Sequence, residues 1–222
     1  MNTSRTGAFS DGIFAIAATL LVLELKVPHA GAGELLGALL ERWSSYATYA
    51  VSFITIGIIW VNHHAIFDRV RSVDRPLLFI NLIFLMLVAV IPFPTALLAD
   101  YLREGHDDRL AAVIYGGTMW LMGLSIVFIW AYVVRGDLLH EGVDRSLARR
   151  SLRNFALGIP AYPLGMGASV LSAKLGLVVY ALVAFFYMFD VLPPLWQPGH
   201  EEGAMAGARI PEPPGIERES QE

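Results

Sequence analysis

Long blocks of apolar residues are the feature that most constrains how this chain can fold. A soluble domain carries roughly 25% charged residues, whereas 16% of these 222 residues are charged and 55% are hydrophobic. A stretch of about 20 mostly apolar residues is long enough to cross a bilayer as a helix. Backbone groups in a bilayer must be hydrogen-bonded within the protein. The sequence therefore predicts an all-α, polytopic membrane protein.

Six such blocks predict six transmembrane helices. The first four are long and continuous, whereas the fifth contains Pro160 and Pro163 and only a short turn separates it from the sixth. Proline is tolerated in a span where neighbouring helices satisfy the freed backbone groups. The predicted spans are residues 9–25, 43–67, 77–98, 111–134, 155–171 and 175–192.

These spans form one predicted transmembrane domain, residues 1–196, followed by a polar tail over residues 197–222. The tail is rich in Gly, Pro and Glu without apolar periodicity, so we expect it to be disordered and cytoplasmic. The loops are too short to fold as a catalytic domain. The chain has no cysteine, which excludes a thiolate metal site and a cysteine nucleophile. An enzyme is the least favoured class, because no catalytic constellation can be assembled.

The distribution of basic residues predicts the orientation of the spans. Lys and Arg are more frequent in loops on the cytoplasmic side of a membrane. Eleven of the 16 fall on one side of the predicted topology and five on the other. Both termini are therefore expected in the cytoplasm. The eleven are Arg5, Arg69, Arg71, Arg75, Arg135, Arg145, Arg149, Arg150, Arg153, Arg209 and Arg218.

The first span combines charges at its start with an apolar stripe beyond them. Ile16, Leu20 and Leu23 fall at i, i+4 and i+7, on one face of a helix. Core packing is the ordinary explanation for such a stripe, and a hydrophobic constriction in a pore is the alternative. The hydroxyl of Thr19 either bonds back to its own helix or contacts a dehydrating ion if the span lines a pore.

A polar network is predicted where the cytoplasmic ends of the first three spans meet. Charged groups near hydrocarbon are usually paired and tied to function. Two adjacent histidines point about 100° apart on a helix, so they cannot share a metal in the i, i+4 manner. The network either pins the helices together or takes part in gating. Its candidate members are Arg5, Ser10, Asp11, His63 or His64, and Asn81.

These residues resemble the transmembrane protein 175 family, whose animal members are lysosomal potassium channels. Arg5-x-x-x-Phe9-Ser10-Asp11 matches the family's signature. The resemblance is strong in the first half of the chain and depends on the number of spans in the second. Further matching segments are Trp60-x-x-His63-His64-x-x-Phe67, Asn81-Leu82 and Pro92-Phe93-Pro94-Thr95.

The resemblance implies a homotetramer in which the first helices of the subunits line a central pore. It implies that bulky apolar side chains form the constriction, and the matching positions are Ile16, Leu20 and Leu23. Thr19 matches a hydroxyl position that bears on selectivity. The signature residues are implied to hold the pore helix through contacts with the second and third spans. The matching positions for those contacts are Trp60, His63 or His64, and Asn81.

The resulting hypothesis is a potassium-permeable, weakly selective cation channel in the inner membrane of a bacterium. A ring of apolar side chains gates by dewetting, and we expect no cofactor, metal site or nucleic-acid partner. The expected partners are other copies of the chain, the lipid bilayer and monovalent cations. Two alternatives stay open. Asp11, His63 and His64 are compatible with a proton-coupled transporter or proton channel, and a non-conducting scaffold would need the polar residues only for folding.

Overall fold

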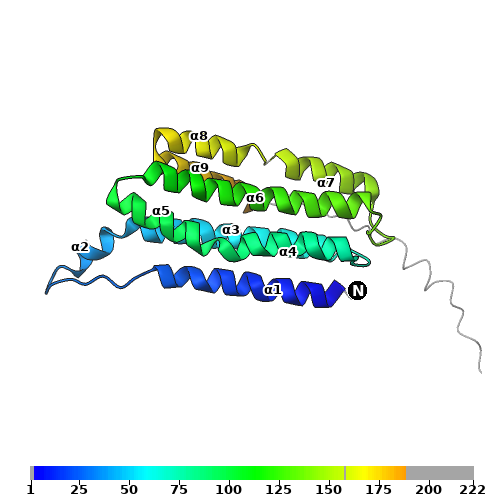
Figure 1. Ribbon diagram of the computed structural model, residues 1–222, viewed down its shortest axis with the longest axis horizontal. Coiled ribbons are helices and arrows are strands. Elements are labelled where there is room, and N and C mark those ends of the chain that lie inside the picture. Colours follow the sequence, from blue (N-terminus) through cyan, green and yellow to red (C-terminus); the bar gives the residue numbers. More distant parts are fainter. Residues whose placement is uncertain (1–2, 158, 189–222) are drawn as a thin grey trace, which may run out of the picture.

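The computed structural model describes residues 3–157 and 159–188, and this part of the chain is an elongated bundle of helices (Figure 1). The prediction of an all-α fold is confirmed. The described elements are α1 (Thr3–Leu20), the 3₁₀ helix η1 (Leu21–Glu24), α2 (Leu35–Leu40), α3 (Trp43–Phe67), α4 (Arg75–Val90), α5 (Pro92–Glu104), α6 (Asp108–Arg135), α7 (Arg145–Leu157), α8 (Ala161–Leu171) and α9 (Ala173–Met188).

Within residues 3–157 and 159–188, four helical segments are long and apolar enough to cross a membrane. They coincide with the first four predicted spans and support a multi-pass membrane protein. In the place of the fifth and sixth predicted spans, α8 has 11 residues and α9 has 16, fewer than the roughly 20 that a span needs. Six spans therefore stay a prediction, and the predicted tail lies outside the described residues. The four segments are Thr3–Glu24, Trp43–Phe67, Arg75–Glu104 and Asp108–Arg135.

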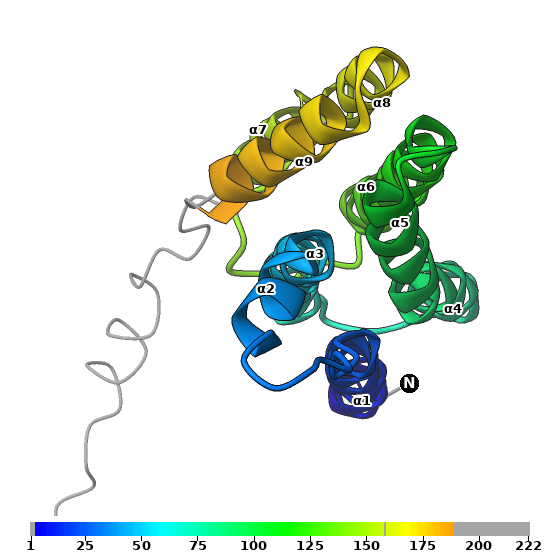
Figure 2. The ribbon, with the colours of Figure 1, turned by 90° about the vertical axis from the view of Figure 1, so that its left-hand side faces the viewer.

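α4 and α5 form one bent helical segment, and Ile91 is the residue that connects them. Pro92 and Pro94 lack backbone N–H groups, so two hydrogen bonds of a regular helix cannot form there. Ile91 nevertheless keeps helical dihedral angles (φ −51°, ψ −39°). Its N–H donates to the carbonyl of Val88 at 3.2 Å. Figure 2, viewed along the bundle, shows α5 leaning away from the line of α4.

Buried hydroxyl groups join α3, α5 and α6 inside the bundle. Ser52 Oγ lies 2.7 Å from Thr95 Oγ1 and 3.0 Å from the hydroxyl of Tyr115. The hydroxyl of Thr95 donates onward to the carbonyl of Ile91 at 2.8 Å. Each hydroxyl has a partner, as a group away from water requires. These contacts hold α3, α5 and α6 in fixed positions relative to one another.

Small residues let α8 and α9 pack closely at the far side of the bundle. A Cβ atom on Gly176 would overlap Ser169 Oγ, and one on Gly165 would overlap the ring of Tyr180. The hydroxyl of Tyr180 donates to the carbonyl of Ala112 at 3.0 Å, which ties α9 to α6. Close packing through small residues is typical of helices in membranes.

α7 precedes α8 and is much more polar than the other long helices. Asp144 caps its first turn: the hydroxyl and N–H of Ser146 donate to Asp144 Oδ1, both at 2.7 Å, and Leu147 N–H donates at 3.3 Å. These three donors hold the pKa of Asp144 below its usual range. Further along α7, Ser151 Oγ accepts from Trp130 Nε1 of α6 at 3.0 Å.

Asp74 fixes the start of α4 and ties it to α6. Its Oδ1 accepts from the N–H of Leu77 at 2.9 Å, and its Oδ2 accepts from the hydroxyl of Tyr132 at 2.7 Å. Asp74 is in the extended conformation and proline follows in the first turn. This combination is typical of a helix start.

Asp74→Ala is expected to lower the free energy of unfolding by about 1–2 kcal/mol, because it removes the cap and leaves Tyr132 without its acceptor. The measurement is the thermal midpoint of helical circular dichroism in detergent. Asp68→Ala is the control, since Asp68 is exposed and pairs only with His64 at 3.5 Å. Equal shifts in both variants would contradict the assignment.

Candidate functional site

α1 lies at the edge of the bundle, where α3 and α4 cover one of its faces (Figure 2). Its buried residues recur at helical spacing and include Ser10, Phe14 and Ala17. Leu21 of η1 continues this face and is fully buried. The described part of the chain leaves the opposite face of α1 uncovered.

The three predicted constriction residues lie on that uncovered face. Ile16 is 60% exposed, Leu20 41% and Leu23 68%. Thr19 is also exposed, and its hydroxyl donates to the carbonyls of Ala15 and Ile16, both at 2.9 Å. The stripe therefore contributes nothing to the core of the single chain.

The uncovered face extends further toward the N-terminus than the sequence analysis inferred. Exposed residues at positions 5, 9, 12, 16, 19 and 23 recur at alternating steps of four and three, which keeps them on one face of a helix, and Leu20 lies beside them. We call this set the α1 stripe. It consists of Arg5, Phe9, Gly12, Ile16, Thr19, Leu20 and Leu23. This spacing can be read from the sequence, so Phe9 and Gly12 could have been assigned to the same helical face as Ile16 by sequence analysis.

A chain of hydrogen bonds joins the covered face of α1 to α4 and α3. Asn81 Oδ1 is an acceptor only, so the imidazole of His63 donates to it through Nε2 at 2.8 Å. Asn81 Nδ2 donates to Ser10 Oγ at 3.1 Å. The hydroxyl of Ser10 donates to the carbonyl of Thr6 at 2.9 Å. This series of hydrogen bonds therefore requires a proton on His63 Nε2.

Aromatic rings enclose His63 and exclude water from it. Its ring stacks on Phe67 at 4.4 Å between centroids and on Phe84 at 5.3 Å, and Phe14 of α1 lies 5.5 Å away. His63 is 1% exposed. His64 points elsewhere, with an exposed side chain 3.5 Å from Asp68. The structure thus places His63, and not His64, beside Asn81.

Asp11 and Trp60 form a second, separate link between α1 and α3. Trp60 Nε1 donates to Asp11 Oδ1 at 2.8 Å, near the surface of the single chain. Both links run from α1 to the helices that cover it, one to α4 and the other to α3. Together they fix which way α1 faces.

Arg5 lies away from both links, although the sequence analysis included it in the network. Arg5 belongs to the exposed α1 stripe, whereas Thr6 and Ser10 lie on the buried face of the same helix. Among residues 3–157 and 159–188, no hydrogen bond or ion pair reaches its guanidinium. In the same part of the chain, no group of three or more His, Cys, Asp or Glu could hold a metal ion.

Comparisons with known proteins agree with this architecture. Residues 5–92 match the family model described as endosomal/lysosomal potassium channel TMEM175. The chain is 49% identical over 196 residues to a potassium channel of Streptomyces collinus, covering 87% of this chain and 95% of that one. It is 39% identical over 191 residues to a potassium channel of Chamaesiphon minutus, covering 83% and 93%.

A solved structure shares the fold. The crystal structure of a lysosomal potassium-selective channel TMEM175 homolog from Chamaesiphon minutus superposes with a TM-score of 0.78 at 36% identity, covering 86% of this chain and 98% of that one. The human endosomal/lysosomal proton channel TMEM175 is 31% identical over 150 residues, which is 64% of this chain and 29% of the human protein.

The bundle and its likeness to solved and named channels define a helical membrane channel protein. The chain belongs to the TMEM175 family, so the family predicted from the Arg5–Asp11 signature is confirmed. The family is one of channels and not a class of enzymes. Its bacterial relatives are named potassium channels, which supports a channel function here.

Proposed function

We propose that four copies of this chain form a potassium-permeable, weakly selective cation channel, with α1 of each copy lining a central pore. The observation that carries the proposal is the α1 stripe, which the chain's own helices leave uncovered. The printed names of the bacterial relatives supply potassium as the permeant ion. We place the protein in the bacterial inner membrane, with both termini in the cytoplasm.

The composition of the α1 stripe fits a pore better than a lipid contact. Its members include Arg5, the small Gly12 and the hydroxyl of Thr19. Beyond Arg75 and Pro76 in its first turn, the exposed residues of α4 are apolar and suit lipid tails. The exposed apolar residues of α4 are Phe79, Leu82, Ile83, Met86 and Val90. The α1 stripe therefore differs from this face of α4 in carrying a hydroxyl group, that of Thr19, whose oxygen a partly dehydrated cation can use.

An open groove between α1 and α3 supports contact with a neighbouring subunit. Its lining includes Ala15 and Ala18 of α1 and Phe53 and Gly57 of α3. A Cβ atom on Gly57 would meet no atom within 4 Å. Small residues allow a helix of another copy to approach closely. Seating a neighbour there would bring the α1 helices of adjacent copies together.

In the assembled channel, Ile16, Leu20 and Leu23 form apolar rings that close the pore by dewetting. Thr19 offers a hydroxyl oxygen to a partly dehydrated ion at the same level. The Ser10–Asn81–His63 chain and the Asp11–Trp60 bond hold the stripe toward the axis. Apolar rings discriminate by the cost of dehydration, which is lower for potassium than for sodium, so the preference is modest.

Proton permeation is the second candidate, because animal relatives are named proton channels. From Phe9 to Leu23 the α1 stripe has no titratable side chain. A proton would therefore cross along water in the open pore. This feature disfavours a proton-coupled transporter, which needs a titratable group in the path of its substrate.

The test is ion flux through purified protein in liposomes, with the number of copies determined by native mass spectrometry. Tetramers are expected to pass potassium down its gradient, sodium more slowly, and no flux is expected from empty liposomes. A pH-sensitive dye measures protons in parallel. Proton flux without potassium flux would favour the second candidate, and verified tetramers that pass no ion would overturn the channel proposal.

A further inference from the structure

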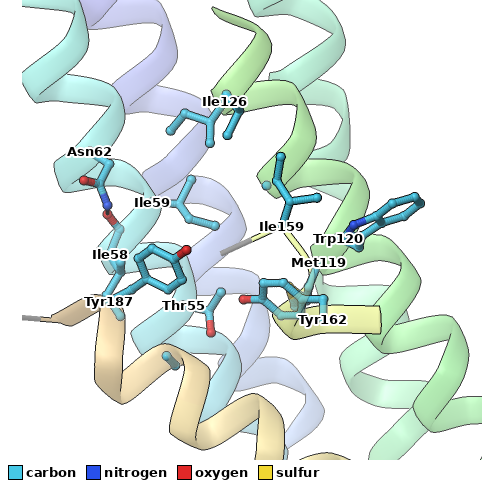
Figure 3. Close-up of a pocket in the computed structure, with 13 residues that line it drawn as sticks. Thr55, Ile58, Ile59, Asn62, Met119, Trp120, Ile126, Ile159, Tyr162 and Tyr187 are labelled. Carbon is cyan, nitrogen blue, oxygen red and sulfur yellow. Dashed lines mark hydrogen bonds between the residues drawn. The ribbon is translucent and has the colours of Figure 1, made fainter. Parts of the chain in front are cut away.

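A second feature lies on the side of α3 away from α1, where α3, α6, α8 and α9 enclose an apolar cavity (Figure 3). Its volume is about 60 Å³, and the 610 Å³ of empty space around it includes open solvent. None of its described lining residues belongs to α1. The cavity is therefore distinct from the proposed conduction path.

One side chain at the rim of this cavity has an unmet hydrogen bond. Trp120 Nε1 is, in the part of the chain that the structure describes, the one buried side-chain nitrogen or oxygen without a partner. The indole N–H of Trp60 donates to Asp11 and that of Trp130 to Ser151. A buried donor without a partner is rare and calls for an explanation. Because an indole N–H can only donate, its missing partner must be an acceptor.

The other polar groups of the cavity can donate, but they can also accept: each tyrosine hydroxyl does both, and Asn62 carries an acceptor oxygen. Within residues 3–157 and 159–188, the hydroxyls of Tyr162 and Tyr187 have no hydrogen-bond partner. Figure 3 shows the hydroxyl of Tyr162 pointing toward the side of the cavity where Tyr187 lies, and Trp120 on α6. Asn62 uses its amide N–H on the carbonyl of Ile58 at 2.9 Å. No charged side chain is among the described lining residues.

The rest of the cavity lining is apolar, and it leaves unfilled space beside Gly123. Ile59, Met119 and Ile126 contribute hydrocarbon and thioether surface. At Gly123, a Cβ atom would meet nothing within 4 Å. A charged molecule would lose its hydration without gaining an opposite charge. A molecule with an apolar body and one acceptor group matches both the apolar lining of the cavity and the unpaired donor of Trp120.

We propose that this cavity binds a small, uncharged, membrane-soluble molecule that carries a carbonyl oxygen. The carbonyl accepts the hydrogen bond of Trp120 Nε1, and its apolar body fills the space beside Gly123. The hydroxyls of Tyr162 and Tyr187 are further donors for a second oxygen. Such a molecule reaches the cavity through the bilayer, where it is already dissolved.

The test uses the full chain in lipid nanodiscs with 6-propionyl-2-(dimethylamino)naphthalene, an uncharged ketone whose emission reports hydrogen bonding to its carbonyl. The dye is excited directly, so loss of a tryptophan does not alter the signal. Saturable binding to the wild-type protein is expected. Trp120→Phe keeps the ring but removes the donor, and should weaken binding about fivefold to tenfold. Gly123→Leu fills the space and should abolish the saturable component.

Trp43→Phe is the matched control, because Trp43 begins α3 outside the cavity and is exposed. It should bind the dye as the wild type does. All variants are compared at equal helical content, and Gly123→Ala replaces the leucine variant if that one does not fold. Equal binding by the wild type and Trp120→Phe would overturn the proposal, as would a signal that does not saturate and reflects partitioning into lipid.

Discussion

Asn81→Leu is expected to lower the free energy of unfolding by about 2–5 kcal/mol and to loosen α1 from the bundle. Leucine is close to asparagine in size but offers His63 no acceptor and Ser10 no donor. His63 would then hold an unpaired N–H among Phe14, Phe67 and Phe84. A buried group that loses its partner costs about 1–3 kcal/mol. The measurement is the denaturation midpoint in detergent, together with the fraction of protein that stays assembled.

Two further variants separate the lost hydrogen bonds from a general effect of the substitution. Asn62→Leu changes the same residue type in α3, where the side chain bonds only to its own helix, and should shift the midpoint little. The double variant His63→Phe/Asn81→Leu removes both polar partners and should regain much of the stability. A midpoint for Asn81→Leu no lower than that of Asn62→Leu would show that the chain of hydrogen bonds contributes nothing.

The energetic asymmetry of α1 explains why this chain of hydrogen bonds bears on function. On its covered face, Phe14, Ala17 and Leu21 are buried and Ser10 is bonded to α4. On its other face, the residues that the structure describes do not cover the helix. Rotation by one residue, about 100°, would remove Ser10 from Asn81 and turn Ile16 away from its present direction. The buried contacts therefore determine which residues any pore formed by α1 would present.

The choice between His63 and His64 could have been predicted from the sequence, whereas the position of Arg5 could not. Adjacent positions on a helix face different ways, so only one could join the network. The buried face of α3 is marked by small hydroxyl residues, among them Thr48, Ser52 and Thr55. His63 continues that face at helical spacing and His64 does not. Arg5 could not be placed in this way, because it lies on the exposed face of α1 and not on the buried one.

The fifth predicted span shows a different limit of the sequence analysis. Apolar blocks identified the first four membrane helices because hydropathy and helix length coincide there. α7 has arginines at 145, 149, 150 and 153 and belongs to no apolar block. It is nevertheless a helix, joined to α6 through Trp130 and Ser151. α7 is amphipathic and polar on average, so a search for continuous apolar blocks misses it, and the prediction began at residue 155 inside α7.

Ile16→Asn is expected to raise potassium flux through reconstituted protein about tenfold. Within the proposed pore, each of the four copies would replace a hydrocarbon side chain with an amide that holds water. Water at the constriction lowers the dewetting barrier, and a reduction of ~1.4 kcal/mol corresponds to a tenfold rate. Sodium flux should rise at least as much, because a wetter constriction demands less dehydration. The measurement is the initial rate of flux at matched protein content and verified assembly.

Ile83→Asn provides a closely matched control for this experiment. Ile83 lies on α4 and is 57% exposed, against 60% for Ile16 on α1. The substitution and the exposure in the single chain are therefore alike, and the two positions differ in the face on which they lie. If the α1 stripe lines the pore, Ile16→Asn alone raises the flux. Equal increases would mean that an added amide makes the bilayer leak, and an unchanged rate for Ile16→Asn would place the ion path somewhere other than along α1.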